Sequence, residues 1–600
     1  MKNKFYLSLI FICLFSFPCL ASDRAQFILK EDIIRTKDVH AGMIGQAFTV
    51  LKGEKVISFK VKIIDVLDRK SKPRNLILFK IIDKDILENG GVAAGMSGSP
   101  IYVHGKLIGA IGYSWSFSDR SLGLATPIED MLNATKWKDK IPVLHSLNDN
   151  DRDRSSNDYL NKEKCVYQRN YIIPLSMPLM TDGISSKMQT YLAKELNTNI
   201  LPLAGNSVDM NNFVDLDYIP KPGSAIGVAL VWGDINVGGI GTLTAVDKNN
   251  KFIAFAHPMM NRGSIATPVT TAKILEIIPS LDHSFKLGTM GKIIGLVTQD
   301  REEAIAGQFG RLAPAISFQV MVNNLDSNVK TVKNFQTIVD PFMTSKLSTS
   351  GIVGIIENCW GRKGEGTVTL TYEINGGQLL TPWKKKNIIF SRTDLAEGIL
   401  KEIETLTEVF SLNQFHDINP MGIKVTANIT SITNVMKIEE ISVPTAEGGY
   451  KAGEDINITV TLRKWRAEKQ VRKICLKIPS DANGLCKINV RAGNNSNVNI
   501  ENNLKPKFIE ITSFEDFLKQ LSSVESNNML LAEIEYNSNK KSSNTEPADI
   551  IDKKFEYQKI KEKIEKGVFK ILEEESLITG NMTTYIKVIK NNDSQKTIKN

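Results

Sequence analysis

The sequence predicts a mainly β protein built from several domains. Six hundred residues are too many for a single hydrophobic core. Residues 39–135 consist of short apolar stretches broken by glycine, lysine and aspartate, which is typical of a small β-barrel. The same texture returns from residue 225, and alternating strands follow Pro420. We therefore expect two barrel-like β blocks and a separate C-terminal sandwich.

Residues 1–21 have the features of a secretory signal peptide. Two lysines precede the apolar run from Phe5 to Phe17, and the small residue Ala21 stands before Ser22. The run is short for a membrane span, and no other segment has an apolar stretch of the length that a span needs. We expect cleavage after Ala21, no transmembrane span afterwards, and export to the periplasm, the cell envelope or the extracellular medium.

Composition and charge argue against nucleic-acid binding and against a metal or organic cofactor. Loss of the signal peptide lowers the formal net charge from +9 to +7, and no stretch combines dense arginine and lysine with stacking aromatics. After cleavage four cysteines remain, none at metal-ligand spacing. These are Cys165, Cys359, Cys475 and Cys486.

Changes in composition divide the mature chain into segments. The run from Asn148 to Asp158 contains no apolar residue and predicts a solvated linker. The expected organisation is a first β block at 22–140, a linker at 141–164, a second β block at 165–330, an α/β extension at 331–415, a β-sandwich at 416–495 and a charged, partly helical or disordered region at 496–600.

Local patterns predict individual elements within these segments. Residues 185–196 contain a short helical pattern, and a second helix opens at Thr393 with an N-cap and a capping acid. The apolar residues that follow at helical spacing are Leu395, Ile399, Ile403 and Leu406. Alternation over 456–462 predicts a strand, and further strands up to Val490 predict an immunoglobulin-like sandwich.

The most informative motif is Gly95-Met96-Ser97-Gly98-Ser99-Pro100. A serine between two glycines can present its hydroxyl on a tight turn, where nothing crowds an incoming carbonyl group. The backbone amides of Gly95, Met96 and Ser97 can then face the space above the hydroxyl, as an oxyanion hole requires. The motif resembles the Gly-x-Ser-Gly-x-Pro turn of trypsin-like serine peptidases, with Ser97 in the nucleophile's place. Ser99 is expected to be structural.

Two longer strings resemble the stage IV sporulation protein B peptidases, the SpoIVB-type serine peptidases. The first string contains AGMIGQAFTVLKGEKVISFKVKIIDVL and GGVAAGMSGSPIYVHGKLIGAIGYSWSFSDRSLGLATPIEDML. The second begins GGIGTLTAVDKNNKFIAFAHPMMNRGSIATP and places His257 where the family's glycine–histidine motif carries its base. The resemblance covers about residues 39–135 and 225–315. It implies a trypsin-like double β-barrel and a serine endopeptidase that acts through an acyl-enzyme.

Two features depart from the family pattern. Ala256 stands where the family has the glycine before its histidine, which adds a methyl group beside the base. The serine block also precedes the histidine block, whereas the family order is His, Asp, Ser. Because a triad is defined by geometry rather than by chain order, the resemblance implies two permuted barrels that face one another. The Gly95 turn should then lie against the loop after Phe255.

The resemblance also implies a role for each candidate residue. Ser97 would be the nucleophile and His257 the base that takes its proton, with His40 as the second choice of base. Asp83 precedes Ser97 by nearly the same number of positions as the aspartate precedes the serine in the family. Asp85 is the alternative. The acid would accept from the second ring nitrogen of the histidine. A Ser–His dyad without an acid is the other possibility.

The sequence therefore predicts an exported serine endopeptidase whose substrate is a protein or peptide. The alternative is a catalytically inactive, SpoIVB-like peptide-binding or scaffold protein of the cell envelope, with Ala256 as a first sign of drift. Reactivity of the serine toward a fluorophosphonate probe separates the two, because only an activated hydroxyl is labelled.

Overall fold

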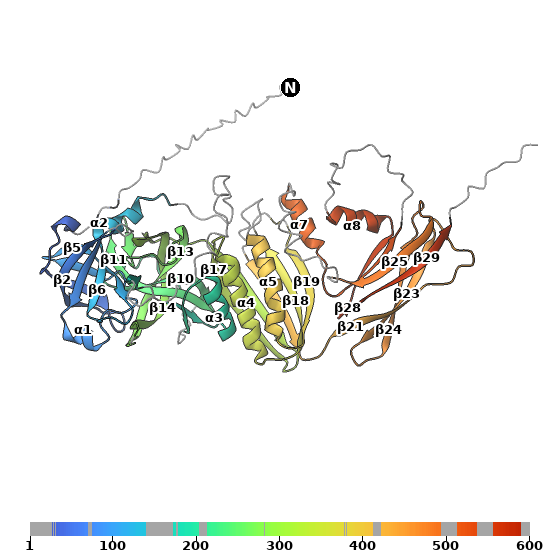
Figure 1. Ribbon diagram of the computed structural model, residues 1–600, viewed down its shortest axis with the longest axis horizontal. Coiled ribbons are helices and arrows are strands. Elements are labelled where there is room, and N and C mark those ends of the chain that lie inside the picture. Colours follow the sequence, from blue (N-terminus) through green and yellow to red (C-terminus); the bar gives the residue numbers. More distant parts are fainter. Residues whose placement is uncertain are drawn as a thin grey trace, which may run out of the picture.

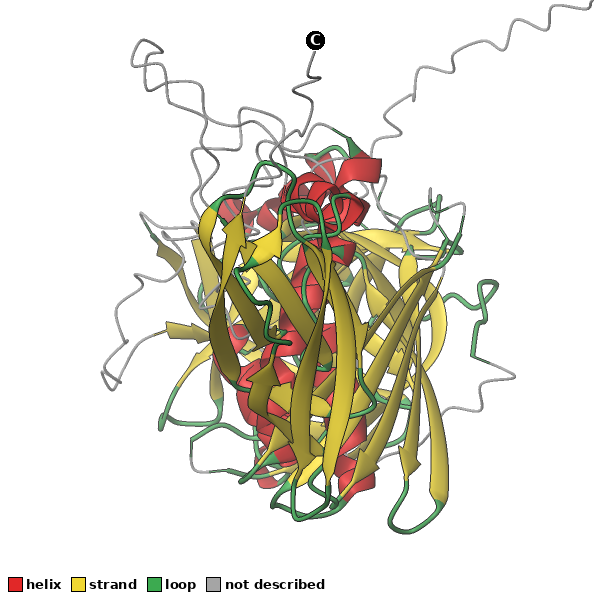
Figure 2. Cartoon of the chain, turned by 90° about the vertical axis from the view of Figure 1, so that its right-hand side faces the viewer, coloured by secondary structure: helices red, strands yellow, loops and turns green. Residues whose placement is uncertain are grey.

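The protein forms four units arranged in a row, as the computed structural model shows (Figure 1). The described residues are 27, 29, 32–69, 75–139, 172–175, 178–202, 213–280, 282–376, 379, 381–411, 422–493, 513–536 and 556–589. The predicted signal peptide (1–21) and linker (141–164) lie outside them. Seen along its long axis, the molecule is built mainly of strands (Figure 2). None of the helices in these ranges has both the length and the apolar character that a membrane span needs.

The first unit is a closed antiparallel barrel. Its strands are β1 (Ile44–Val50), β2 (Val56–Asp68), β3 (Asn75–Ile81), β4 (Pro100–Val103), β5 (Lys106–Trp115) and β6 (Leu122–Pro127). The order is β4-β1-β2-β3-β6-β5, and pairing of β4 with β5 closes the ring, while β7 (Ile172–Pro174) adds to β5. Short helices join the strands: η1 (Thr36–Asp38), α1 (Lys84–Glu88), α2 (Ile128–Met131) and η2 (Leu132–Lys136). Fully buried Phe59 and Phe79 help to fill the interior.

The second unit closes in the same way. Its strands are β10 (Ala225–Gly233), β11 (Asn236–Val246), β12 (Lys251–Ala254), β13 (Gly263–Ile278), β14 (Phe285–Arg301) and β15 (Ala304–Phe309). The order is β10-β13-β14-β15-β12-β11, and β10 pairs with β11, while β8 (Leu179–Asp182) and β9 (Ile200–Pro202) extend the sheet beyond β11. Two such barrels side by side confirm the predicted mainly β fold with a trypsin-like double barrel.

The third unit is a mixed α/β layer that continues the sheet of the second barrel. Its strands are β16 (Ala315–Asn324), β17 (Val329–Ile338), β18 (Gly366–Asn375), β19 (Trp383–Ser391) and β20 (Gly422–Thr430). The helices are α3 (Ser186–Glu195), α4 (Thr344–Trp360) and α5 (Leu395–Ser411). Strand β17 joins the layer to β10, and β20 lies between β16 and β18. The layer thus reaches beyond the predicted bounds of 331–415 on both sides.

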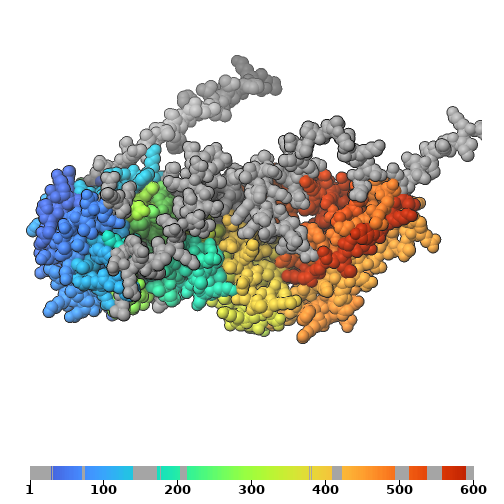
Figure 3. Space-filling view, viewed as in Figure 1, coloured from blue at the N-terminus to red at the C-terminus, as the bar shows by residue number. Residues whose placement is uncertain are grey.

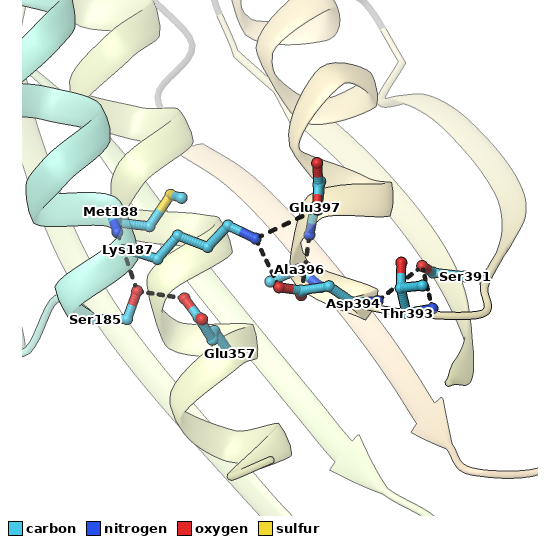
Figure 4. Close-up of polar contacts among 9 residues, drawn as sticks. All are labelled: Ser185, Lys187, Met188, Glu357, Ser391, Thr393, Asp394, Ala396 and Glu397. Atoms are coloured by element: carbon cyan, nitrogen blue, oxygen red, sulfur yellow. Dashed lines mark hydrogen bonds and ion pairs between the residues drawn. The ribbon is translucent and has the colours of Figure 1, made fainter. Parts of the chain in front are cut away.

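Polar contacts at the ends of the three helices hold this layer together (Figure 4). The Ser185 hydroxyl accepts from the amide of Met188, which caps α3, and donates to Glu357 of α4 at 2.5 Å. Lys187 of α3 forms a 2.8 Å ion pair with Asp394, the residue that precedes α5. Both predicted helices are therefore confirmed, and Asp394 supplies the cap at the second one.

The fourth unit is a sandwich of two sheets around a separate core. One sheet contains β21 (Val435–Ser442), β23 (Asp455–Lys464), β24 (Lys469–Lys477) and β28 (Leu577–Thr579); the other contains β22 (Tyr450–Lys451), β25 (Gly484–Ala492), β26 (Met529–Glu535), β27 (Phe569–Glu573) and β29 (Asn581–Ile589). The predicted strand at 456–462 lies within β23. The predicted sandwich at 416–495 contains only part of these strands, because β26 to β29 come from the segment expected to be charged and partly helical.

Helix α7 (Phe514–Ser522) returns from the sandwich region to cover the α/β layer, and α8 (Glu556–Glu565) lies beside it. Phe517 and Leu521 of α7 are buried in the core cluster of the second barrel and the layer. The indole nitrogen of Trp383 donates to the hydroxyl of Ser522 at 3.0 Å. Strand β28 of the sandwich also contacts β19 of the layer. Figure 3 shows the sandwich (orange to red) next to the layer (yellow).

We predict that β20 is needed for the layer to fold. A chain that ends at residue 413 lacks β20 and leaves the inner edges of β16 and β18 unpaired. A chain that ends at residue 433 keeps β20 and loses α7, α8 and the sandwich. Thermal unfolding followed by circular dichroism should show a cooperative transition for the longer chain and none, or a much lower melting temperature, for the shorter one. Equal melting temperatures would contradict this assignment of β20.

Candidate active site

The serine turn lies at the interface of the two barrels. It joins α1 to β4, and both Gly95 (φ +89°) and Gly98 (φ +90°) adopt the left-handed conformation that favours glycine. A Cβ atom at Gly98 would overlap the carbonyl oxygen of Thr242 and lie 2.5 Å from the backbone nitrogen of Phe255. Glycine at this position therefore lets the turn touch the second barrel directly.

Strand β11 holds the turn through three hydrogen bonds. The backbone amide of Thr242 donates to the carbonyl of Ser97 at 2.8 Å, and its hydroxyl donates to the carbonyl of Gly95 at 2.9 Å. The hydroxyl of Thr244 donates to the carbonyl of Gly98 at 2.7 Å. The carbonyl groups of Gly95, Ser97 and Gly98 thus point into the second barrel, and the backbone of Ser97 is fixed relative to β11.

Two of the three predicted oxyanion amides have no hydrogen-bond acceptor within the described part of the chain. These are the amides of Gly95 and Ser97, both of which are buried. The amide of Met96 instead donates to the carbonyl of Ala93 at 2.9 Å, inside the turn. An oxyanion hole needs donors that are not already used. The arrangement therefore favours Gly95 and Ser97, and not Met96, as the donors.

Neighbouring hydrogen bonds fix the directions of these two amides. In a planar trans peptide the N–H group points away from the carbonyl of the preceding residue. The carbonyl of Ala94 accepts from the amide of Lys286 at 3.0 Å, which turns the Gly95 amide away from β14. The carbonyl of Met96 accepts from the amide of Ser99 at 2.9 Å and orients the Ser97 amide in the same manner.

His257 stands in the loop that follows β12, as the sequence predicts. Phe255 (φ +68°) and Ala256 (φ +57°) are both left-handed, which costs roughly 1–2 kcal/mol for each non-glycine residue. This conformation gives a physical reason for the glycine of the family at the position of Ala256. The Ala256 carbonyl accepts from the hydroxyl of Thr126 at 2.6 Å, which attaches the loop to the first barrel.

The contacts of the imidazole leave one nitrogen available as a base. His257 is 2% exposed, and its Nδ1 lies 2.7 Å from the carbonyl oxygen of Pro258. Because a carbonyl can only accept, Nδ1 carries the hydrogen and Nε2 carries the lone pair. Nε2 is buried and has no hydrogen-bond partner among the described residues. Burial lowers the pKa of His257 to about 4, although the carbonyls of Pro258 and Leu175 act in the opposite direction.

The turn and the histidine loop come to the same interface, but their side chains are not joined. The amide of Phe255 donates to the carbonyl of Thr242, the residue that also binds the backbone of Ser97. No hydrogen bond connects the Ser97 hydroxyl to His257 Nε2, and Ser97 is only 1% exposed. The site is therefore closed, and the Ser97 hydroxyl is not engaged by the imidazole. The roles of Ser97 and His257 remain predictions.

The structure does not bring the predicted acid to the histidine. Asp83 is the residue before α1 and makes no side-chain capping bond, and Asp85 is exposed. Neither forms a hydrogen bond or ion pair with His257, whose Nδ1 is occupied by a backbone carbonyl. His40, the second choice of base, is also exposed. Of the alternatives, the geometry fits a Ser–His dyad.

A separate serine–histidine pair lies at the edge of the first barrel. The Ser116 hydroxyl is 2.8 Å from Nε2 of His283, and the same nitrogen lies 3.4 Å from Asp282. Because both contacts use one nitrogen, the carboxylate does not hold the opposite side of the ring as it would in a triad. Ser116 is therefore useful as a control residue for the assignment of Ser97.

Sequence reasoning missed Lys286, which lies directly behind the turn. Its side chain is completely buried, and Nζ donates to the Thr49 hydroxyl at 2.8 Å and to the Thr242 hydroxyl at 3.5 Å. Ser99 donates to the same Thr49 oxygen at 3.0 Å, which ties its hydroxyl to this buried group. Burial lowers the pKa of Lys286 to about 7. A single lysine in a strand ordinarily faces solvent, so nothing in the sequence marks it.

Asp300 supports the loop that carries His257. Its carboxylate accepts from the amides of Met259, Met260 and Arg262 at 2.8 to 3.1 Å. The Arg262 guanidinium in turn binds Asp340 at 3.2 Å and so links the loop to the α/β layer. Within the ranges that the structure describes, no cluster of histidine, cysteine, aspartate or glutamate could hold a metal ion.

We predict that Gly98→Ala disrupts the barrel interface, whereas Gly105→Ala does not. Both glycines are left-handed, but a Cβ at Gly105 meets no atom within 4 Å. Gly105→Ala should therefore cost only about 1–2 kcal/mol of unfolding free energy. Gly98→Ala adds steric overlap and should cost roughly 2–5 kcal/mol in total. Denaturant unfolding of both variants measures the difference, and equal losses would contradict the close contact.

Comparison with known proteins agrees with the motifs of the first barrel. The family model described as SpoIVB peptidase S55 matches residues 22–132, which include the Ser97 turn but not His257. No curated protein matches the chain. No solved structure matches it either. Residues 22–132 are thus similar to the SpoIVB peptidase S55 family, as the motifs of this segment predict.

Proposed function

We propose that this protein is an exported serine endopeptidase in which Ser97 is the nucleophile and His257 the general base. The match to the SpoIVB peptidase family supports a serine peptidase with protein substrates. The observation that carries the proposal is that His257 Nε2 is buried with an unpaired lone pair. The loop that carries it packs against the serine turn, in which two amides have no acceptor among the described residues. Such groups, unpaired and buried, have a stability cost unless they serve a ligand or a reaction.

The proposed reaction follows from these groups. The Ser97 oxygen attacks the carbonyl carbon of the scissile peptide, and its proton passes to His257 Nε2. The carbonyl oxygen becomes negative and is held by the amides of Gly95 and Ser97. His257 then protonates the leaving amine, and water hydrolyses the acyl-enzyme in a second round of the same steps. The carbonyl of Pro258 orients the imidazole, which is the task of the acid in a triad.

Access to the site requires a local movement. The amide of Leu175 donates to the carbonyl of Gly112 at 2.9 Å, and the carbonyl of Leu175 also contacts the His257 ring. Leu175 follows β7, which adds as an outer strand to β5. Displacement of this segment would uncover the imidazole. The closed state is also the observation that favours the alternative function, an inactive peptide-binding or scaffold protein.

A fluorophosphonate probe tests the proposal. The wild-type protein should be labelled on Ser97, and Ser97→Ala and His257→Gln should lower the labelling rate at least about 1000-fold. Ser99→Ala should retain labelling, because its hydroxyl is buried against Thr49. Asp83→Asn should also retain labelling, since this carboxylate does not contact His257. Mass spectrometry of the labelled peptide identifies the modified residue.

Matched controls decide between the alternatives. Ser116→Ala should leave the labelling rate unchanged, because its partner His283 lies outside the proposed site. Loss of labelling in Ser116→Ala, with retention in Ser97→Ala, would move the nucleophile to Ser116. A correctly folded wild-type protein that reacts at no serine would support the scaffold function instead.

We propose export on the basis of residues 1–21, whose apolar run and small residues suit a signal peptide. The expected outcome is a mature chain that begins at Ser22 when the full-length protein is produced in a bacterial host. Intact mass and N-terminal sequencing of the exported fraction measure this directly. A cytoplasmic protein that keeps residues 1–21 would contradict the proposal.

A further inference from the structure

We propose that Lys286 is a positioning residue of the peptidase site: its buried positive charge holds the Gly95 turn and stabilises the negative tetrahedral intermediate. This inference rests on the proposed function, because it concerns the charge that develops when Ser97 attacks a carbonyl. Lys286 does not contact the reacting atoms. It acts through Thr242 and through the backbone of the turn.

The first observation is that the backbone of Lys286 sets the direction of an oxyanion amide. The amide of Lys286 donates to Ala94 at 3.0 Å, and the amide of Ala94 donates to Ser284 at 2.8 Å. These two bonds form a short parallel bridge between the turn and the start of β14. Because they fix the peptide that joins Ala94 to Gly95, the Gly95 amide has one possible direction.

The second observation is that the side chain of Lys286 is linked to Gly95 through Thr242. Its Nζ donates to the Thr242 hydroxyl at 3.5 Å, and this hydroxyl donates to the carbonyl of Gly95 at 2.9 Å. The ammonium group therefore polarises the hydroxyl that binds Gly95. A positive charge held this close to the turn attracts a negative oxygen that forms at the turn, and burial in a medium of low polarity increases the effect.

The third observation is that no residue in the described ranges neutralises this charge. Nζ binds the hydroxyls of Thr49 of β1 and Thr242 of β11, and Ser99 of the turn donates to the same Thr49 hydroxyl. None of these three groups is ionisable at neutral pH. Within the described residues, Lys286 forms no ion pair, and burial is the sole cause of its lowered pKa. A buried lysine is usually paired with a carboxylate. Here the charge is left available for an anion that forms during the reaction.

A contribution to the stability of the fold does not explain why a lysine is buried at position 286. The pKa of Lys286 falls from 10.5 to about 7 on folding. Between about pH 10.5 and pH 7 the lysine is protonated in the unfolded chain but neutral in the folded protein. The folded protein therefore loses stability as the pH falls through this range, and the loss is complete below about pH 7. A methionine of similar length would avoid this loss. A residue that destabilises the fold beside a catalytic turn is expected to serve the reaction.

The two buried groups together define a pH window for labelling. His257 must be neutral to accept a proton, which requires a pH above about 4. Lys286 must be charged, which requires a pH below about 7. The groups that face His257 are Tyr113 of β5, Phe255 and the carbonyls of Pro258 and Leu175, and none carries a charge in this range. The rate should therefore fall on the alkaline side near neutrality.

The experiment measures the rate of fluorophosphonate labelling of the full-length mature protein from pH 4 to 10. In the labelling step the Ser97 oxygen bonds to phosphorus, fluoride leaves and the serine proton passes to His257. For the wild type we expect a decrease of about tenfold centred near pH 7, since one charge contributes less than a direct oxyanion donor. Lys286→Met should show no such decrease and should react at the slow rate of the alkaline wild type at every pH. It should be at least as stable as the wild type.

Lys385→Met is the matched control. Lys385 lies on β19 in the α/β layer, and burial also lowers its pKa. This variant should keep the wild-type rate and pH profile. A wild-type rate that stays constant from pH 6 to 9, or an unchanged profile in Lys286→Met, would overturn the inference while leaving Ser97 as the nucleophile. If Lys286→Met does not fold, the wild-type profile alone decides. A wild type that is labelled at no pH would overturn the proposed function and this inference together.

Discussion

The insertion of the Gly95–Ser99 turn into the second barrel is the constraint on which the rest of the site depends. Three carbonyl groups of the turn are held by Thr242 and Thr244, and Gly98 touches the backbone of Phe255. The amides of Gly95 and Ser97 are left without an acceptor among the described residues. The same contact brings the histidine loop to the interface. One packing interaction between the barrels therefore positions both the proposed oxyanion donors and the proposed base.

The order of the motifs in the chain does not affect this arrangement. Ser97 belongs to the first barrel and His257 to the second, and each barrel closes upon itself through β4–β5 or β10–β11. A site at the interface of two closed barrels needs only that the two loops meet. The reversed order of serine and histidine blocks is therefore compatible with a peptidase, provided that the interface is kept.

The sequence predicts well what depends on local patterns and less well what depends on long-range pairing. Alternation and capping residues identify the strand at 456–462 and the helix that starts after Asp394. The position of β20 between β16 and β18 could not be predicted, because a strand that is polar on one face can join any sheet edge of matching register. The sequence does not predict strands β26 to β29 of the sandwich, because charged residues surround their short apolar segments.

The site shows the same division. Glycine and serine at positions 95 to 98 specify a turn by their own conformational preferences, and that prediction requires no partner. The spacing from Ser97 points to Asp83, but the partner of an imidazole is whichever acceptor the fold brings to Nδ1. Here the acceptor is the backbone carbonyl of Pro258. Every residue has a backbone carbonyl, so no sequence pattern can mark this one. Lys286 is hidden for the converse reason, because its charge has a role only once Thr242 and the turn surround it.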